Sequence, residues 1–210
     1  MRQQFLLLVT LILLAGSSCR KAPLNMWQTL CVEEGQHAYR PLDLNGYKEF
    51  TRQKYSYQFD PFDTYDLDTI DQCDWLKLGG HSLWPTTNHK DALMVGMRYD
   101  TEGFWWLVPY YHKNEGTDYG PAPCSGYYDQ ELDPDFLAVQ VWPGETFEVE
   151  YQVWQPNAMS VLIITPNGQS NLLVQFDVPI SKTREINPWF GGNRKAPNRL
   201  CLYRRLEYLN

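Results

Sequence analysis

Residues 146–154 read TFEVEYQVW, and their side chains alternate strictly between polar and apolar. Successive side chains of a β-strand point to opposite faces, so Phe147, Val149, Tyr151 and Val153 would all point toward a core. The opposite face would carry threonine, glutamate and glutamine. This period of two is typical of an antiparallel sheet with one covered face and one solvated face.

Similar segments lie on both sides of this stretch. Residues 159–165 and 170–176 are largely apolar and flank Pro166-Asn167-Gly168-Gln169, and an Asn-Gly pair between such runs indicates a β-hairpin. Further strands are predicted at 92–99, 104–112 and 199–209. Many short strands without a long helical pattern predict an all-β protein. We expect an antiparallel two-sheet sandwich of the jelly-roll or concanavalin-like type, with a closed β-barrel as the alternative.

The composition limits the class of protein. A chain of 210 residues with 15% aromatic and 20% charged residues can build one domain with a full core, but it is short for two enzyme domains. The formal net charge of −7 argues against a nucleic-acid binder. Beyond the amino-terminal stretch, no apolar run approaches the length needed to span a bilayer, so an integral membrane protein is not expected.

The first 18 residues are predicted to be a secretory signal peptide. Arg2 precedes the apolar stretch 5–15, which is too short to span a bilayer, and small residues lead to Cys19. In bacterial lipoprotein signals a Leu-Ala-Gly-like trio directly precedes the acylated cysteine, whereas here two serines intervene. We expect Cys19 to be acylated and to anchor the protein in a lipid bilayer. The alternative is ordinary cleavage near Ser17, which would leave Cys19 free.

Cysteine parity supports acylation. The chain has five cysteines, and an unpaired thiol is unusual in an oxidising compartment. With Cys19 acylated, an even set remains that allows three disulfide pairings: Cys31, Cys73, Cys124 and Cys201. The alternative is that these four are buried free thiols. Residues 19–46 are polar and irregular and are predicted to be a lipidated tether, followed by a sandwich domain over 47–210. The protein is thus expected in the bacterial cell envelope, facing either the periplasm or the cell surface.

The excess of aromatic residues suggests a ligand. Flat rings with a polar edge stack on sugar rings, and the chain has 8 tryptophans and 14 tyrosines. Alternation in 104–112 separates Trp105 and Tyr111 from Trp106, Tyr110 and His112, so one set should lie outside the main core. The main hypothesis is non-catalytic binding of a glycan or another envelope component. The predicted ligand-binding residues are Trp84, His89, Arg98, Trp105 and Tyr111.

Two other functions are considered. A polysaccharide lyase needs a tyrosine or histidine base and an arginine that neutralises a carboxylate. Tyr110, His112, His89 and Arg98 would supply these groups in a lyase or glycoside hydrolase acting on an acidic polysaccharide. The second alternative is a structural accessory lipoprotein of an envelope protein complex, with an unidentified protein partner.

The two acidic runs of the sequence, at 60–74 and 129–135, are predicted to be solvated loops. Alternating oxygen ligands suit calcium, but Pro134 stands where a calcium-binding loop needs glycine. A structural calcium at the second acidic run is the alternative, with Asp129, Glu131, Asp133 and Asp135 as ligands. Zinc-type cysteine spacings, phosphate loops and dinucleotide motifs are absent from the sequence, so no cofactor is expected.

Several short segments resemble a family of exported Bacteroidota lipoproteins. They are DQCDWLKLG at 71–79, NHKDA at 88–92, VGMRY at 95–99 and INPWFGGN at 186–193, followed by Ala196-Pro197. The sequence departs from the family pattern at Asp91, Met97 and Trp189, and in an insert over 114–134. The resemblance implies a concanavalin-like sandwich at the cell envelope and brings no particular activity with it.

Overall fold

The computed structural model describes residues 26–41, 47–68, 72, 74–84, 90–113, 116–119, 138–191 and 194–210. In these residues no helix is long and apolar enough to cross a bilayer. The strands are β1 (Gln28–Val32), β2 (Tyr47–Lys48), β3 (Arg52–Phe59), β4 (Leu76–Ser82), β5 (Ala92–Asp100), β6 (Phe104–Lys113), β7 (Gly116–Tyr119), β8 (Val139–Val141), β9 (Thr146–Trp154), β10 (Ala158–Thr165), β11 (Gly168–Gln175), β12 (Thr183–Ile186) and β13 (Leu200–Leu209).

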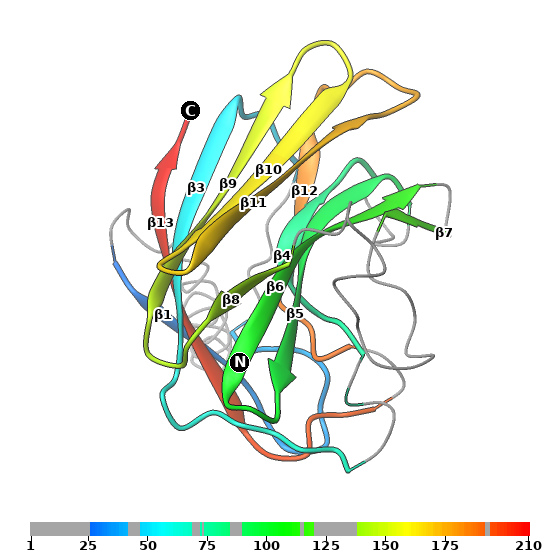
Figure 1. Ribbon diagram of the computed structural model, residues 1–210. Coiled ribbons are helices and arrows are strands. Elements are labelled where there is room, and N and C mark those ends of the chain that lie inside the picture. The colour runs from blue at the N-terminus through cyan, green and yellow to red at the C-terminus, as the bar shows by residue number, and fades with distance from the viewer. Residues whose placement is uncertain are drawn as a thin grey trace, which may run out of the picture.

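The strands form two antiparallel sheets that face each other (Figure 1). A six-stranded sheet has the order β1-β13-β3-β9-β10-β11, and a seven-stranded sheet has the order β2-β12-β4-β5-β6-β7, with β8 also paired to β6. Every pairing between described strands lies within one of these sheets. The predicted sandwich is therefore confirmed, and the alternative of a closed barrel is wrong.

The strand predicted over 146–154 coincides with β9. Between 146 and 153 its apolar side chains are buried and its polar side chains are not, in strict alternation along the strand. Phe147, Val149 and Tyr151 are buried between the sheets, while Glu148 and Glu150 lie on the outer face. The predicted hairpin is formed by β10 and β11, in which Thr165 pairs with Gly168 across a two-residue turn. Proline at the first turn position and glycine just after the second suit such a turn.

Aromatic rings from both sheets meet in the core. Phe59 of β3 stacks on Trp105 of β6 with ring centroids 4.1 Å apart, and Phe147 of β9 lies 5.3 Å from Phe59. Tyr65 and Phe190 extend the same cluster at 5.3 Å from each other. Burial of such large rings contributes about 1.5–3 kcal/mol each. The core thus depends on side chains from segments far apart in the sequence.

A buried ion pair also joins the two sheets. Arg204 of β13 donates to the Glu185 carboxylate of β12 over 2.9 Å, and both side chains are almost fully buried. The hydroxyl of Tyr55 donates to the same carboxylate oxygen over 2.6 Å. Lys48 lies 3.6 Å from the other carboxylate oxygen. Buried charges are tolerated only when they are paired and hydrogen-bonded in this way.

The outer face of the seven-stranded sheet is covered as well. Ala92, Met94 and Ile186 form a second buried cluster, against which Tyr110 packs. Leu93, Val95 and Met97, which alternate with the residues of β5 in that cluster, belong to the main core. Both faces of β5 are therefore buried, whereas β9 has one buried face and one solvated face.

The folded domain begins earlier than predicted. Residues 28–41 are part of the sandwich, so the predicted tether over 19–46 is too long. β1 pairs with β13 along its whole length, and its Leu30 and Val32 are buried. A disulfide joins Cys31 to Cys201. Cys73, Cys124, the signal peptide and Cys19 lie outside the described residues.

Removing this disulfide should destabilise the domain. The bond joins residues 170 positions apart, and loss of a native disulfide from a small exported domain costs about 2–5 kcal/mol. We expect Cys31→Ala/Cys201→Ala to unfold at a lower urea concentration than the oxidised protein, with a steeper dependence on urea because the unfolded chain without the cross-link exposes more surface. Peptide mapping without reduction is the control, and a map that links Cys31 to another cysteine would contradict the pairing.

Candidate functional site

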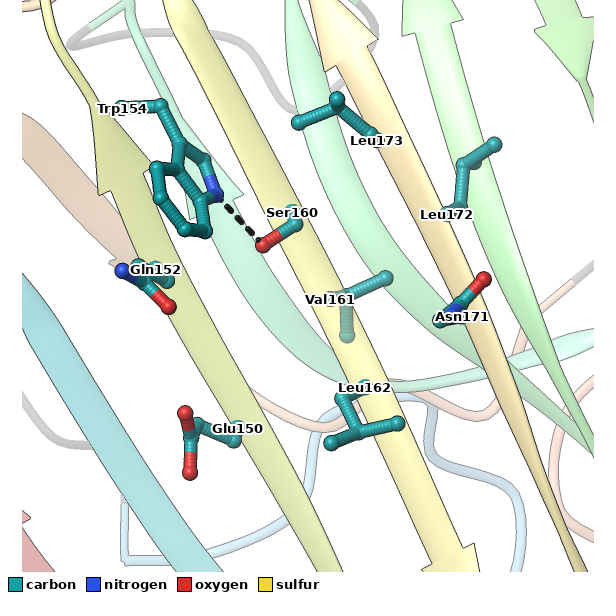
Figure 2. Close-up of a pocket in the computed structure, with 9 residues that line it drawn as sticks. All are labelled: Glu150, Gln152, Trp154, Ser160, Val161, Leu162, Asn171, Leu172 and Leu173. Carbon is teal, nitrogen blue, oxygen red and sulfur yellow. Dashed lines mark hydrogen bonds between the residues drawn. The ribbon is translucent and has the colours of Figure 1, made fainter.

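A shallow hollow of about 310 Å³ lies on the outer face of the six-stranded sheet, over β9, β10 and β11 (Figure 2). Its volume is at the lower end of the range found for ligand sites. Figure 2 shows that the lining side chains come from three adjacent strands. The lining includes Glu150, Gln152, Trp154, Ser160, Leu162, Asn171 and Leu173.

Strand register arranges the outward side chains in rows. Paired residues lie about 4.8 Å apart across the sheet, and successive rows are two residues, or roughly 7 Å, apart along the strands. Apolar and hydrogen-bonding side chains are mixed in each row. One row contains Arg52, Gln152, Ser160 and Leu173, and the next contains Lys54, Glu150, Leu162 and Asn171.

Trp154 supplies the aromatic surface of the hollow. Its side chain is 48% exposed at the end of β9. The indole nitrogen donates a hydrogen bond of 2.9 Å to the hydroxyl oxygen of Ser160 on β10 (Figure 2). This bond restrains the ring beside the hollow. Leu173 on β11, 65% exposed, provides an aliphatic surface on the other side of Ser160.

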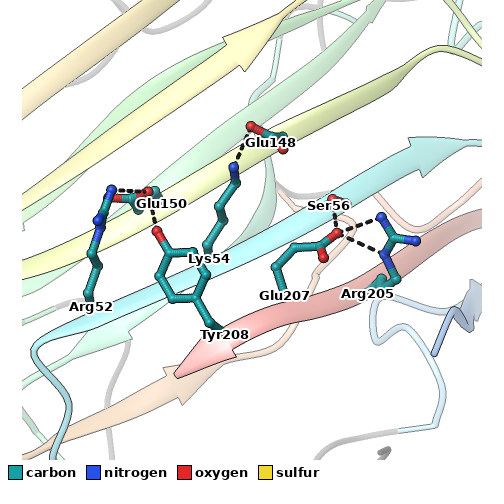
Figure 3. A network of polar contacts seen from close by, with 8 residues as sticks. All are labelled: Arg52, Lys54, Ser56, Glu148, Glu150, Arg205, Glu207 and Tyr208. Carbon is teal, nitrogen blue, oxygen red and sulfur yellow. Dashed lines mark hydrogen bonds and ion pairs between the residues drawn. The ribbon is translucent and has the colours of Figure 1, made fainter. Parts of the chain in front are cut away.

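A polar network borders the hollow on the side of β3 and β13 (Figure 3). The guanidinium of Arg52 donates to both carboxylate oxygens of Glu150, over 3.0 Å for the second contact, and the hydroxyl of Tyr208 donates over 2.5 Å. Burial alone would raise the pKa of Glu150, but the hydrogen bonds from Arg52 and Tyr208 outweigh burial and lower it. Burial and the Glu150 carboxylate raise the pKa of Tyr208 to about 12.

The network continues along β3 and β13. Lys54 lies 2.7 Å from the Glu148 carboxylate, and Arg205 lies 2.7 Å from the Glu207 carboxylate, which also accepts a hydrogen bond from Ser56 (Figure 3). Exposed pairs of this kind contribute at most about 1 kcal/mol each. Their effect here is to fix long side chains and to neutralise the charge of this face.

The pKa values of Glu150 and Tyr208 are shifted away from neutrality, in opposite directions. Glu150 is held ionised and Tyr208 is held protonated near neutral pH, whereas a general acid or base works best with a pKa near the working pH. Trp154 and Leu173 offer apolar contacts. Gln152, Asn171 and Ser160 offer donors and acceptors.

Two predicted ligand-binding residues lie in the core instead. Trp105 is 1% exposed and Tyr111 is also buried, both facing the six-stranded sheet. Trp105 stacks on Phe59, and Tyr111 packs edge-on against Phe176 at 5.6 Å. The prediction that these rings contact a ligand is therefore wrong, because this face of β6 is the one turned toward the six-stranded sheet.

Of the predicted catalytic residues, the structure brings Tyr110 and His112 together, while Arg98 lies further along the same sheet. Arg98, Tyr110 and His112 lie on the outer face of the seven-stranded sheet, and the Tyr110 and His112 rings are 4.8 Å apart. Tyr110 pairs with Met94, four residues from Arg98, which corresponds to roughly 14 Å along the strand. Arg98 is buried and its guanidinium lies 4.9 Å from the centre of the Trp75 ring.

Trp84 is partly exposed at the end of β4, on the other sheet from the hollow. Its indole nitrogen donates to the Asp91 carboxylate over 2.7 Å, and Lys90 lies 4.5 Å from the ring centre. His89 lies outside the described residues, as do the proposed calcium ligands Asp129, Glu131, Asp133 and Asp135. Within the described part of the chain, no group of three or more histidine, cysteine, aspartate or glutamate side chains is placed to hold a metal ion.

The sequence did contain a signal for the hollow. Trp154 has the same parity as Glu148, Glu150 and Gln152 in the alternating strand, so the pattern itself places this tryptophan on the solvated face. No such sequence signal identifies Asn171 and Leu173. They line the hollow because β11 pairs with β10.

Comparison with known proteins gives a limited result. No family model and no curated protein sequence matches the chain. Among solved structures it is similar to an alginate lyase from a Chlorella virus, at 11% identity, covering 85% of this chain and 81% of that one, with a TM-score of 0.43. It is also similar to the enzymatically active domain of tailspike protein 2 of bacteriophage CBA120, at 7% identity, 91% and 30% coverage and a TM-score of 0.39.

A third similar structure is the receptor-binding domain of botulinum neurotoxin D, at 8% identity, 91% and 42% coverage and a TM-score of 0.34. The chain spans less than half of the tailspike and neurotoxin chains. Identities this low and TM-scores below 0.5 transfer no activity to this protein.

The Arg52 contact should control the ionisation of Glu150. In Arg52→Met the carboxylate stays largely buried without its cation, so its pKa should rise. In the wild type, the lowered pKa stabilises the fold above the ordinary glutamate pKa, and this contribution is lost as pH falls through the folded-state pKa. We expect Arg52→Met to show a higher pKa of Glu150 in an NMR titration of the carboxyl carbon. We also expect its free energy of unfolding, measured with urea at several pH values, to increase less as pH rises through the ordinary glutamate pKa.

Lys182→Met, which removes an exposed pair with Glu49, is the control. An unchanged Glu150 titration in Arg52→Met would contradict the assignment.

Proposed function

We propose that this protein is a non-catalytic glycan-binding lipoprotein of the bacterial cell envelope, and that it binds its ligand on the outer face of β9, β10 and β11. The observation that carries the proposal is the hollow itself, where an exposed, hydrogen-bonded Trp154 lies beside amide and hydroxyl side chains.

Sugar rings combine an apolar face with a rim of hydroxyl groups. The indole of Trp154 and the side chain of Leu173 match the apolar face. Gln152 and Asn171 each carry both a donor and an acceptor, as a hydroxyl group does, so they can hydrogen-bond to the rim. A solvated sheet face of this breadth also suits an extended chain of sugars better than a small enclosed ligand.

The geometry favours binding over the lyase alternative. Elimination from a uronic acid needs the base and the neutralising arginine within reach of one sugar residue. Arg98 and Tyr110 are instead separated along the sheet and occupied with different neighbours.

Anchoring through an acylated Cys19 belongs to the same proposal. Its support is the Cys31–Cys201 disulfide, since disulfides persist in oxidising compartments outside the cytoplasm. The resemblance to exported Bacteroidota lipoproteins agrees with this location. Residues 20–27 between Cys19 and β1 can span at most roughly 28 Å when fully extended, so the domain would stay close to the bilayer.

Replacing Trp154 should weaken glycan binding. We expect Trp154→Ala to bind a glycan found by array screening roughly ten- to a hundredfold more weakly, as for loss of a central tryptophan from an interface. Titration calorimetry and tryptophan fluorescence would measure this. Trp142→Ala is the matched control, since Trp142 is 45% exposed at the opposite end of β9. Equal losses in both variants, or no glycan bound by the wild type, would refute the proposed site.

Replacing Cys19 should release the protein from membranes. We expect Cys19→Ser to lose incorporation of a labelled fatty acid and to move from the membrane fraction to the soluble fraction, because the acyl chains would supply the attachment. Ser17→Ala, which keeps the cysteine, should remain in the membrane fraction. Membrane attachment of Cys19→Ser with unchanged labelling would show that the lipid is not on this residue.

A further inference from the structure

The cations on the outer face of the six-stranded sheet are already paired. Among the described residues of that face, Arg52 is bound to Glu150, Lys54 to Glu148 and Arg205 to Glu207. The contact of Arg52 is bidentate, which is the strongest arrangement of a guanidinium and a carboxylate. A negatively charged ligand on this face would therefore have to compete with a carboxylate for each cation.

The strands that form the hollow carry almost no charge. Residues 151–176, which include the end of β9 and all of β10 and β11, contain no aspartate, glutamate, lysine, arginine or histidine. Glu150 is the one charged side chain in the lining. Gln152 and Asn171 provide uncharged hydrogen-bonding groups, with Leu162 and Leu173 between them.

This distribution of charge discriminates between classes of glycan. A uronate or sulfate group in the hollow would lose its water shell and find no free cation among the described residues to replace it, because Arg52 is already bound to both oxygens of Glu150, and such unpaired desolvation is one way a site rejects a ligand. The hydroxyl groups of an uncharged sugar need no cation. They can also donate to the Glu150 carboxylate, which has acceptor capacity beyond its bonds to Arg52 and Tyr208.

We infer that the hollow selects uncharged glycans and excludes their uronic acid counterparts. This inference rests on the proposed function and adds the class of ligand to it. It also separates the site from the acidic polysaccharide considered for the lyase alternative.

Matched oligosaccharide pairs test the inference. Each pair has the same ring stereochemistry and linkage and differs only at C6, as in β-1,4-linked mannose and mannuronic acid oligomers, or glucose and glucuronic acid oligomers. We expect the mature chain to bind the neutral member of at least one pair at least tenfold more tightly than the acidic member. Binding of the neutral member should not change with salt concentration, because it depends on no ion pair.

Glu150→Gln should reduce the discrimination. The substitution removes the carboxylate that holds Arg52 and leaves its guanidinium able to bind an acidic sugar, so the affinity for the acidic member should rise relative to the neutral one. Glu148→Gln is the matched control: it removes a glutamate from the same face of the same strand, but this residue does not line the hollow. Its effect on the preference should be smaller.

The outcomes separate the two proposals. If the acidic member binds as tightly as the neutral one, and Trp154→Ala weakens both, the inference is wrong while the proposed function stands. If no member of any pair binds, the proposed function itself fails, and an uncharged sheet face that contacts another protein becomes the better interpretation. The ratio of the wild-type affinities for the two members of a pair decides the matter even if Glu150→Gln does not fold.

Discussion

The stacking of Phe59 on Trp105 determines which face of each sheet is turned inward. The two rings come from different sheets, are buried, and lie 4.1 Å apart. Because side chains alternate along a strand, an inward Phe59 turns Arg52, Lys54 and Ser56 of β3 outward. An inward Trp105 likewise turns Tyr110 of β6 outward. The polar network and the hollow on the outer face of the six-stranded sheet are thus on the reverse side of the aromatic core.

Alternation made part of the fold predictable. The predictions of a strand over 146–154 and of the hairpin after it were correct. One face of β9 is apolar and the other polar, so the pattern indicates both that the segment is a strand and which face is turned inward. In β6 both faces carry aromatic rings, and Trp106 on the outer face is itself partly buried, so the pattern separates Trp105 from Trp106 but does not tell which one faces the other sheet. The wrong assignment of Trp105 and Tyr111 follows from this ambiguity.

The hollow and its polar border were harder to predict because they are formed by the pairing of strands far apart in the sequence. Glu148 and Glu150 look like an ordinary solvated side when β9 is read alone. Arg52 lies 98 residues before Glu150 and Tyr208 lies 58 residues after it. Only the strand order β13-β3-β9-β10-β11 places these residues in rows beside Asn171 and Leu173. A single sequence gives the parity of Trp154, but it does not give the neighbours that surround it.

The position of β1 also bears on how the domain would respond to mechanical load. β1 is the edge strand of the six-stranded sheet, and a pull on the amino-terminal segment would load its ladder with β13 in shear. The Cys31–Cys201 disulfide lies at the fourth of the five paired positions, counted from the amino terminus. Only three residue pairs can therefore separate before the covalent bond carries the force. Beyond that point the tension passes into β13, which is flanked on its other side by β3. A domain held by its amino terminus against flow would therefore carry the force within its sheet instead of losing its edge strand.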